Sequence, residues 1–159
     1  MSFGTGYHET TRLTLRLLEK YIHRINSMLD VGTGTGVLAI AAVKLGAASA
    51  WGIDIDEWSI DNAGENIIAN DVADKVTISD TPVTSIDRSF RLITANLTLN
   101  TNSELLPTFR KLLRDGGTII LSGLLAADTE TMRSRLRAEQ FTILEELTEN
   151  EWIAIAARK

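Results

Sequence analysis

Three glycines stand at alternate positions in the segment DVGTGTG, which runs from Asp30 to Gly36. A short apolar segment, SML, precedes it, and a longer one, VLAIAAVKL, follows at once. Glycine weakens both helices and strands, so such a loop must need an unusual backbone conformation or the close approach of another molecule. Ligands of open α/β sheets bind where a strand ends, and this loop leaves an expected strand there.

An acidic residue stands before this loop, and a second ends the next expected strand. Asp54 follows the apolar segment AWGI, where its carboxylate can accept hydrogen bonds from both hydroxyls of a ribose. The glycines are spaced G-x-G-x-G, so the dinucleotide fingerprint G-x-G-x-x-G is missed. Asp30 would repel a pyrophosphate, but it would attract the sulfonium and ammonium groups of S-adenosylmethionine (SAM). The pattern favours SAM over NAD, and a tight turn without a ligand is the remaining alternative.

The rest of the chain supplies elements that would position these residues. Strand-length apolar runs alternate with helical periodicity, which indicates one doubly wound α/β domain with a parallel sheet. The last two strands are joined by only TEN, so they are expected to pair as an antiparallel hairpin at one edge. Seven strands are expected at 27–31, 50–55, 75–79, 90–96, 118–123, 141–147 and 151–158. Helices are expected at 11–25, 37–46, 57–70, 105–113 and 129–139.

Residue chemistry adds four local predictions. Thr10 is the expected N-cap of the first helix, because a hydroxyl can accept from the free amides of the first turn. Trp58 and Ile68 are expected to face the core. Pro107 is expected near the start of its helix or at a break. The sequence RDGG at 114–117 predicts a turn.

Bulk composition narrows the class of protein further. The 159 residues carry a net charge of −5, which argues against tight non-specific binding to nucleic acid. The chain has no cysteine, which fits a reducing compartment and excludes thiolate metal sites. The first residues, MSFGTGYHETT, lack the basic and apolar regions of a signal peptide. No apolar run reaches the length needed to span a membrane, so a cytoplasmic protein is expected.

Several segments together resemble the PrmA family of methyltransferases, which modify large-subunit ribosomal protein eleven. They follow in order along the whole chain, and the most specific is FGTGYHETT at 3–11: FGTGYHETTRLTLRLLE, LDVGTGTGVLAIAAVKLGA, GIDIDEWSIDNAGENIIAN, ITANL, GGTIILSGLL and EWIAIAAR. The resemblance implies a class I SAM-dependent methyltransferase with a Rossmann-like sheet of seven strands and an antiparallel last strand.

The resemblance also implies roles for individual residues. Gly32, Thr33 and Gly34 would form the loop that approaches the cofactor, and Asp54 would bind its ribose. Other cofactor contacts would come from Phe3 over the cofactor, Thr11 at the methionine carboxylate, Ile55 on the adenine face and Asp80 at the adenine amino group. Asn96 would line the methyl-transfer site as the catalytic residue. No metal is implied. No general base stands out, and His8 is expected to hydrogen-bond within its own loop.

The family carries a substrate-recognition domain before the region that matches, and this chain begins inside that region. We therefore expect residues 1–159 to be the catalytic domain alone. The expected function is methyl transfer from SAM to protein amino groups, a ribosomal protein being the partner. The alternatives are a methyltransferase of the same core that acts on a small molecule, and a SAM-binding module without turnover. The oligomeric state does not follow from the sequence.

Overall fold

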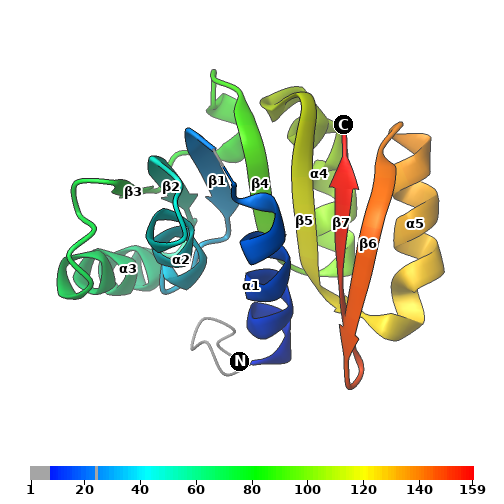
Figure 1. Ribbon diagram of the computed structural model, residues 1–159, viewed down its shortest axis with the longest axis horizontal. Helices are drawn as coiled ribbons and strands as arrows, with labels where there is room; N and C mark the ends of the chain where they lie inside the picture. Colours follow the sequence, from blue (N-terminus) through cyan, green and yellow to red (C-terminus); the bar gives the residue numbers. More distant parts are fainter. Residues whose placement is uncertain (1–7, 24) are drawn as a thin grey trace.

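The computed structural model describes residues 8–23 and 25–159 of the chain. Helices and strands alternate through most of it (Figure 1). The strands are β1 (Ser27–Val31), β2 (Ser49–Ile53), β3 (Val76–Ser79), β4 (Phe90–Asn96), β5 (Leu113–Leu125), β6 (Thr142–Glu149) and β7 (Trp152–Arg158). The helices are α1 (Glu9–Tyr21), α2 (Val37–Lys44), α3 (Glu57–Ala69), α4 (Leu99–Leu112) and α5 (Thr129–Ala138), with short 3-10 turns η1 (Val83–Ser85) and η2 (Ala126–Asp128).

All seven strands form one sheet in the order β3-β2-β1-β4-β5-β7-β6. The pairs among β1 to β5 are parallel, whereas β7 runs antiparallel to both β5 and β6. The predicted α/β class and the predicted antiparallel hairpin at one edge are therefore confirmed. The chain progresses outward from β1 through β2 to β3 and then returns to the other side of β1 with β4. This reversal is the place where open α/β sheets hold their ligands.

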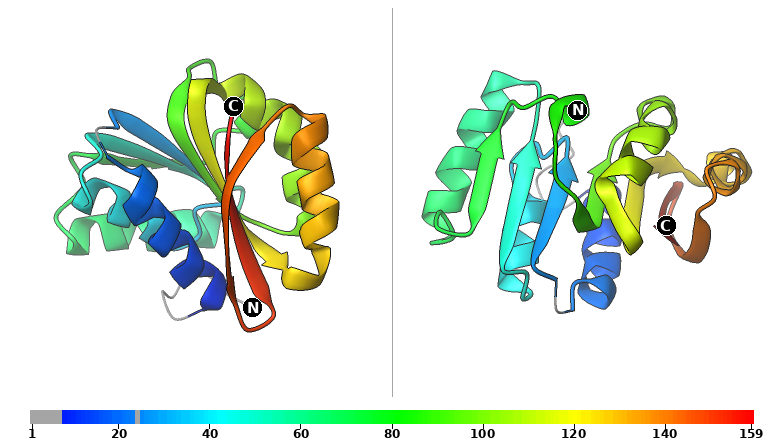
Figure 2. Two further views of the ribbon diagram at one scale, coloured as in Figure 1. Left: turned by 45° about the vertical axis from the view of Figure 1, so that its right-hand side comes forward. Right: turned by 90° about the horizontal axis from the view of Figure 1, so that it is seen from above.

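Helices cover both faces of the sheet (Figures 1 and 2). Helices α1 and α2 pack on one face, with α3 beside β3, while α4 and α5 pack on the other face. Each strand interior therefore contributes apolar side chains alternately to two cores. The α1 side contains Leu13, Leu17, Met28, Leu92 and Ile120, and the α4 side contains Phe90, Ile93, Phe109, Leu121 and Met132.

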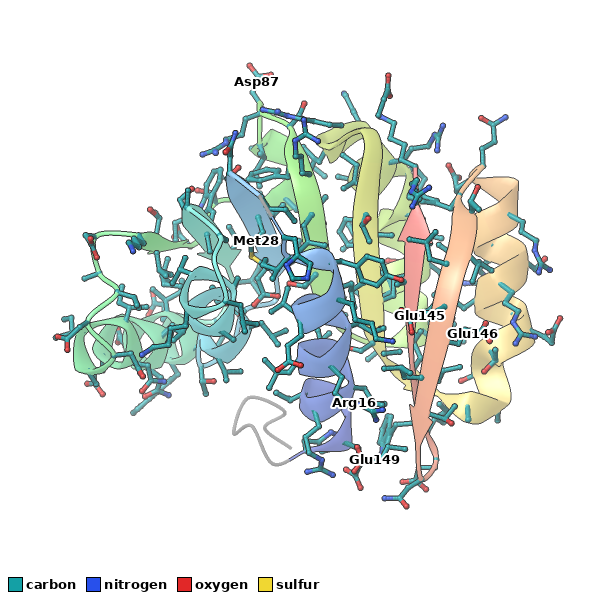
Figure 3. The ribbon with its side chains drawn as sticks, in the orientation of Figure 1. Arg16, Met28, Asp87, Glu145, Glu146 and Glu149 are labelled. Atoms are coloured by element: carbon teal, nitrogen blue, oxygen red, sulfur yellow. The ribbon has the colours of Figure 1, made fainter. Side chains whose placement is uncertain are left out.

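Helix α1 is joined to β6 by charged side chains as well as by its apolar face. Arg12 donates to Glu149, with its Nη2 2.6 Å from Oε1, and Lys20 donates to Glu145 at 2.8 Å. Glu145 and Glu149 point toward α1, whereas Glu146 points to the other side of β6, toward α5 (Figure 3). This alternation follows from the two-residue period of a strand. The contact between Arg12 and Glu149 holds the first turn of α1 at the edge of the sheet where the parallel strands end (Figure 1).

Helices α1 and α4 both begin earlier in the chain than predicted, and α1 ends at Tyr21 instead of residue 25. The N-cap of α1 is His8 rather than Thr10, and its Nδ1 accepts from the backbone N of Thr10 at 3.2 Å. A hydrogen bond of His8 within its own segment, as expected, is thus confirmed. Helix α4 begins at Leu99, where Thr98 caps it, so Pro107 lies well inside the helix. Its missing N–H leaves one carbonyl of the preceding turn without its helical partner.

Two predictions of burial and one prediction of a turn are wrong, because contacts between elements override the local sequence pattern. Trp58 and Ile68 are 77% and 69% exposed, because α3 lies at the β3 edge and fully buries only Ala63. The RDGG segment at 114–117 lies within β5 instead of before it. Phe90 pairs with Leu113 and Leu92 with Thr118, so the four residues bulge out of an otherwise continuous strand.

Candidate functional site

A cleft of about 290 Å³ lies at the point where the strand order reverses. Its walls come from the ends of β1 and β2, from the segment after β3, and from the start of α4. Its lining includes Gly32, Asp54, Ile55, Val83, Leu97 and Thr101. These segments are distant in sequence but meet here because the carboxyl ends of neighbouring parallel strands share one edge of the sheet.

The glycine loop borders this cleft at Gly32, and its backbone geometry accounts for its glycines. Gly32, Gly34 and Gly36 have φ values of +74°, +57° and +82°, which side chains disfavour. The amide of Gly32 donates to the carbonyl of Ile53 at 2.9 Å, so the loop folds back on β2. A Cβ at Gly32 would lie 2.5 Å from Cδ2 of Leu97, whereas one at Gly34 would meet nothing within 4 Å. The loop is therefore packed at one glycine and open at the next.

Asp54 is fixed by backbone amides at the end of β2. Its Oδ2 accepts from the N of Gly34 at 2.9 Å, and its Oδ1 accepts from the N of Asp56 at 3.0 Å. Each carboxylate oxygen can accept more than one hydrogen bond, so both keep capacity for a ligand in the cleft. Ile55, the next residue, is 96% exposed and lines the same cleft. An acid and an apolar side chain therefore stand next to each other at the mouth.

A set of polar side chains interrupts the apolar core beneath α1. Asp30 on β1 pairs in register with Thr94 on β4, and Asn96 on β4 pairs with Ser122 on β5. Strand alternation places all four on the face that α1 covers. Thr94 donates to Oδ1 of Asp30 at 2.7 Å. The other oxygen, Oδ2, and the Oδ1 of Asn96 are buried and have no hydrogen-bond partner among the described residues. Buried acceptors of this kind are costly unless a ligand supplies donors.

Asp30 is the acidic residue of this region whose pKa is changed most. Complete burial raises its pKa to about 6, although the hydroxyl of Thr94 favours the charged form. The carboxylate is only 1% exposed and does not line the cleft. That its carboxylate lies beside a bound ligand therefore stays a prediction.

The structure brings some of the predicted site residues together and separates others. Gly32, Asp54 and Ile55 line the cleft. Thr33 is 4% exposed, turns its hydroxyl toward Gly52 of β2 and does not line the cleft. The remaining predicted residues lie outside the lining: Gly34 beside Asp54, Asp80 exposed after β3, Thr11 buried in the first turn of α1, and Asn96 next to the lining residue Leu97. Phe3 falls outside the described residues.

Sequence reasoning missed part of the wall. Thr81, Pro82 and Val83 follow β3 and line the cleft, as do Thr101 and Leu105 of α4. Their positions after a strand and on an amphipathic helix give a weak local signal. Because the helix is predicted to start at residue 105, Thr101 is assigned to a loop, and the direction of the Thr101 side chain cannot be inferred.

This sheet order, with β7 antiparallel between β5 and β6 and a glycine loop after β1, defines the class I methyltransferase fold. A family model described as "Ribosomal protein L11 methyltransferase (PrmA)" matches residues 1–159, and the chain belongs to that family. The ribosomal protein L11 methyltransferase of Pelobacter propionicus is 37% identical over all of this chain and 53% of its own length. That of Porphyromonas gingivalis is 40% identical over 98% of this chain and 54% of its own length. The chain thus spans about half the length of the curated relatives it matches.

Solved structures agree with this assignment of the fold. A ribosomal protein L11 methylase from Lactobacillus delbrueckii subsp. bulgaricus superposes with a TM-score of 0.91 at 33% identity, over 97% of this chain and 81% of that one. An RNA methyltransferase from Salinibacter ruber, solved in complex with S-adenosyl-L-homocysteine, gives a TM-score of 0.71 at 20% identity, over 91% and 86%. The second likeness shows the shared fold alone.

Neither a membrane-spanning helix nor a metal-ligand cluster occurs among residues 8–23 and 25–159. None of the helices in this part of the chain is both long and apolar enough to cross a membrane. Within the same residues, His, Asp and Glu side chains form no cluster of three or more that could hold a metal ion.

Proposed function

We propose that this chain binds SAM in the cleft and transfers its methyl group to amino groups of ribosomal protein L11. The observation that carries the proposal is the match of the whole chain to one methyltransferase family. The cleft at the strand reversal, with Asp54 fixed at its mouth, supports it. The ribosomal substrate comes from the relatives' names, and we place the reaction in the cytoplasm, where such a substrate is available.

The residues present fit such a cofactor. Asp54 offers two carboxylate oxygens to a ribose, and the open side of Gly34 leaves room for a ligand above the loop. Ile55 and Val83 provide apolar surface for a base. On the α1 side, the unpartnered Oδ2 of Asp30 gives a negative potential below the loop that suits a cationic ligand. When bound, SAM supplies an activated methyl group on a positively charged sulfur.

The protein's own part in the chemistry is alignment and desolvation. An attacking amine must lose its proton first, and burial disfavours the charged amine, which helps that loss. The Oδ1 of Asn96 is buried and unpartnered among the described residues, so it is ready to accept a hydrogen bond from an amine N–H. Such a bond would orient the lone pair of the nitrogen. In this proposal Asn96 is the catalytic residue and no nucleophilic side chain is needed.

Calorimetry and a transfer assay test the proposal on the purified chain. We expect the wild type to bind SAM and S-adenosylhomocysteine and not NAD. Asp54→Ala should weaken binding by about tenfold or more, because a hydrogen bond to a charged group contributes about 1.5–3 kcal/mol. Asn96→Ala should leave the Kd for S-adenosylhomocysteine unchanged and abolish transfer of radiolabel from SAM to L11.

Asn100→Ala is the matched control, because the same side chain is exposed four residues farther on, in the first turn of α4. It should behave as the wild type in both assays. Binding without transfer to L11 or to any other ribosomal protein would overturn the proposed acceptor and favour a small-molecule acceptor or a module without turnover. Binding of NAD in place of SAM would overturn the cofactor.

A further inference from the structure

Strand β5 makes an unusually close approach to the segment that follows β4. Gly123 has a φ of +78° and lies beside Asn96 and Leu97. A Cβ at this position would overlap the carbonyl oxygen of Leu97, and it would lie 2.7 Å from the carbonyl carbon. It would also stand 3.1 Å from the Oδ1 of Asn96. The bare Cα of Gly123 therefore packs directly against the Leu97–Thr98 peptide and close to the Asn96 side chain.

Ser122, one residue earlier, attaches three elements to this place. Its carbonyl accepts from the N of Leu97 at 3.2 Å and from Nδ2 of Asn102 at 3.0 Å. Its hydroxyl lies 2.6 Å from Oγ1 of Thr14, which donates its own proton to the carbonyl of Thr10 at 2.7 Å. The Ser122 hydroxyl is thus the donor to Thr14. The side chains of Ser122, Asn102 and Thr14 are all fully buried.

The ladder of the sheet is interrupted at the same two residues. The pairing of β5 with β7 shifts register between Leu121 and Leu124, so Ser122 and Gly123 form a bulge. Bulges redirect the backbone and are common beside active sites. Here Ser122 keeps its place in the β4–β5 ladder, opposite Asn96, and its carbonyl accepts from the N of Leu97 just beyond the end of β4. The bulge takes Gly123 out of register with β7 at the point where it lies beside the carbonyl of Leu97.

We propose that Ser122 and Gly123 form a seat that fixes Asn96 for methyl transfer, which makes Gly123 a positioning residue of the reaction. The inference rests on the proposed function, since it assigns a role toward the same acceptor site. The seat acts on the catalytic side chain through the backbone of Leu97. Leu97 also lines the cleft, but Gly34 and Asp54, on its cofactor side, lie on other elements, so we expect only a small effect on cofactor affinity.

The chain contains a closely matched control for this idea. Gly116 has the same φ as Gly123, +78°, but a Cβ there would meet nothing within 4 Å. Gly116→Ala therefore introduces the same backbone strain without touching the Asn96–Leu97 segment. Any effect of Gly123→Ala beyond that of Gly116→Ala comes from the displaced seat.

Hydrogen exchange of the cofactor-free chain is the first measurement. The amide of Leu97 is held by the carbonyl of Ser122, so Gly123→Ala should accelerate its exchange by about tenfold or more through local opening. Gly116→Ala should leave it unchanged. Equal exchange rates of the Leu97 amide in the two variants would overturn the proposal that Gly123 fixes this segment. This readout needs no methyl transfer, so it stands apart from the test of the proposed function.

Kinetics with L11 is the second measurement. Gly123→Ala should lower kcat by about a hundredfold, because a displacement of about 1 Å can cost that much, and leave KM and the Kd for S-adenosylhomocysteine within about twofold. A kcat equal to that of Gly116→Ala would overturn the positioning role. If the wild type itself transfers no methyl group, the proposed function fails. The exchange result then still shows whether Gly123 fixes the Leu97 segment.

Asn102→Leu replaces Gly123→Ala if the latter does not fold. It removes the second donor to the Ser122 carbonyl while it keeps the buried volume. We expect faster exchange of Leu97 and a lower kcat with unchanged cofactor affinity, and Asn100→Leu, at an exposed site on the same helix, should show neither. No difference between these two variants would equally overturn the proposal.

Discussion

Replacing Asp30 by asparagine should stabilise the cofactor-free protein at neutral pH. The folded-state pKa is raised from 3.8 to about 6 by burial, so ionisation of Asp30 opposes folding. Stability linked to this group is fully present below the unfolded pKa and is lost as the pH rises through the folded pKa. At about 1.4 kcal/mol for each pKa unit, the loss above pH 6 is about 3 kcal/mol. Asparagine does not ionise, so the variant does not undergo this loss of stability.

Urea unfolding of both proteins between about pH 4 and pH 8 measures this effect, because the two stability curves should diverge across the folded pKa. The difference in unfolding free energy should grow by about 3 kcal/mol between these limits and then level off. Curves that stay parallel over the whole range would refute the raised pKa of the buried Asp30 carboxyl. Thr94→Val provides a check with the opposite sign, since it removes the hydroxyl that favours the charged form. It should destabilise the protein more at pH 8 than at pH 4.

Three further predictions concern packing, helix propensity and surface charge. Gly52→Ala should destabilise the protein by about 1–3 kcal/mol in urea unfolding, because its Cβ would lie 2.5 Å from Oγ1 of Thr33. Gly64→Ala in α3, with open space around it, should instead stabilise by up to about 1 kcal/mol, and destabilisation there would contradict the reasoning. Arg133 donates to Glu146 and lowers its pKa, so this stability is present above the unfolded pKa and lost as the pH falls. Arg133→Gln should therefore lower Tm at neutral pH and lower it less once the pH falls below the lowered pKa of Glu146, and an equal loss at both would exclude the ion pair as its cause.

The order of strands and helices was predictable because it depends on local patterns. Apolar runs of strand length and helical periodicity gave seven strands and the edge hairpin, and the short TEN link alone required the hairpin to be antiparallel. The glycine loop and the acid of the next strand were also local. Both belong to adjacent segments that must meet when β1 and β2 pair, so Gly32 and Asp54 could be placed at one site.

Predictions that depended on which neighbour covers a segment were less successful. Trp58 and Ile68 lie on a helix with an apolar pattern, but α3 packs at the edge of the sheet and leaves both exposed. Residues 114–117 carry a strong turn sequence, yet β5 continues through them as a bulge, because Leu113 and Thr118 on either side both pair with β4. Propensity is a weak influence on such segments once tertiary contacts form.

The sequence by itself therefore determined the fold class, the loop beside Asp54 and the family. Only the tertiary structure decided how the end of β4 is held. The need for glycine at 123 comes from the carbonyl of Leu97, which belongs to another strand, and no pattern within β5 reports that contact. The buried, unpartnered oxygens of Asp30 and Asn96 likewise depend on what α1 and the loop cover. Local periodicity selects an element, whereas steric exclusion and burial arise between elements that are distant in the chain.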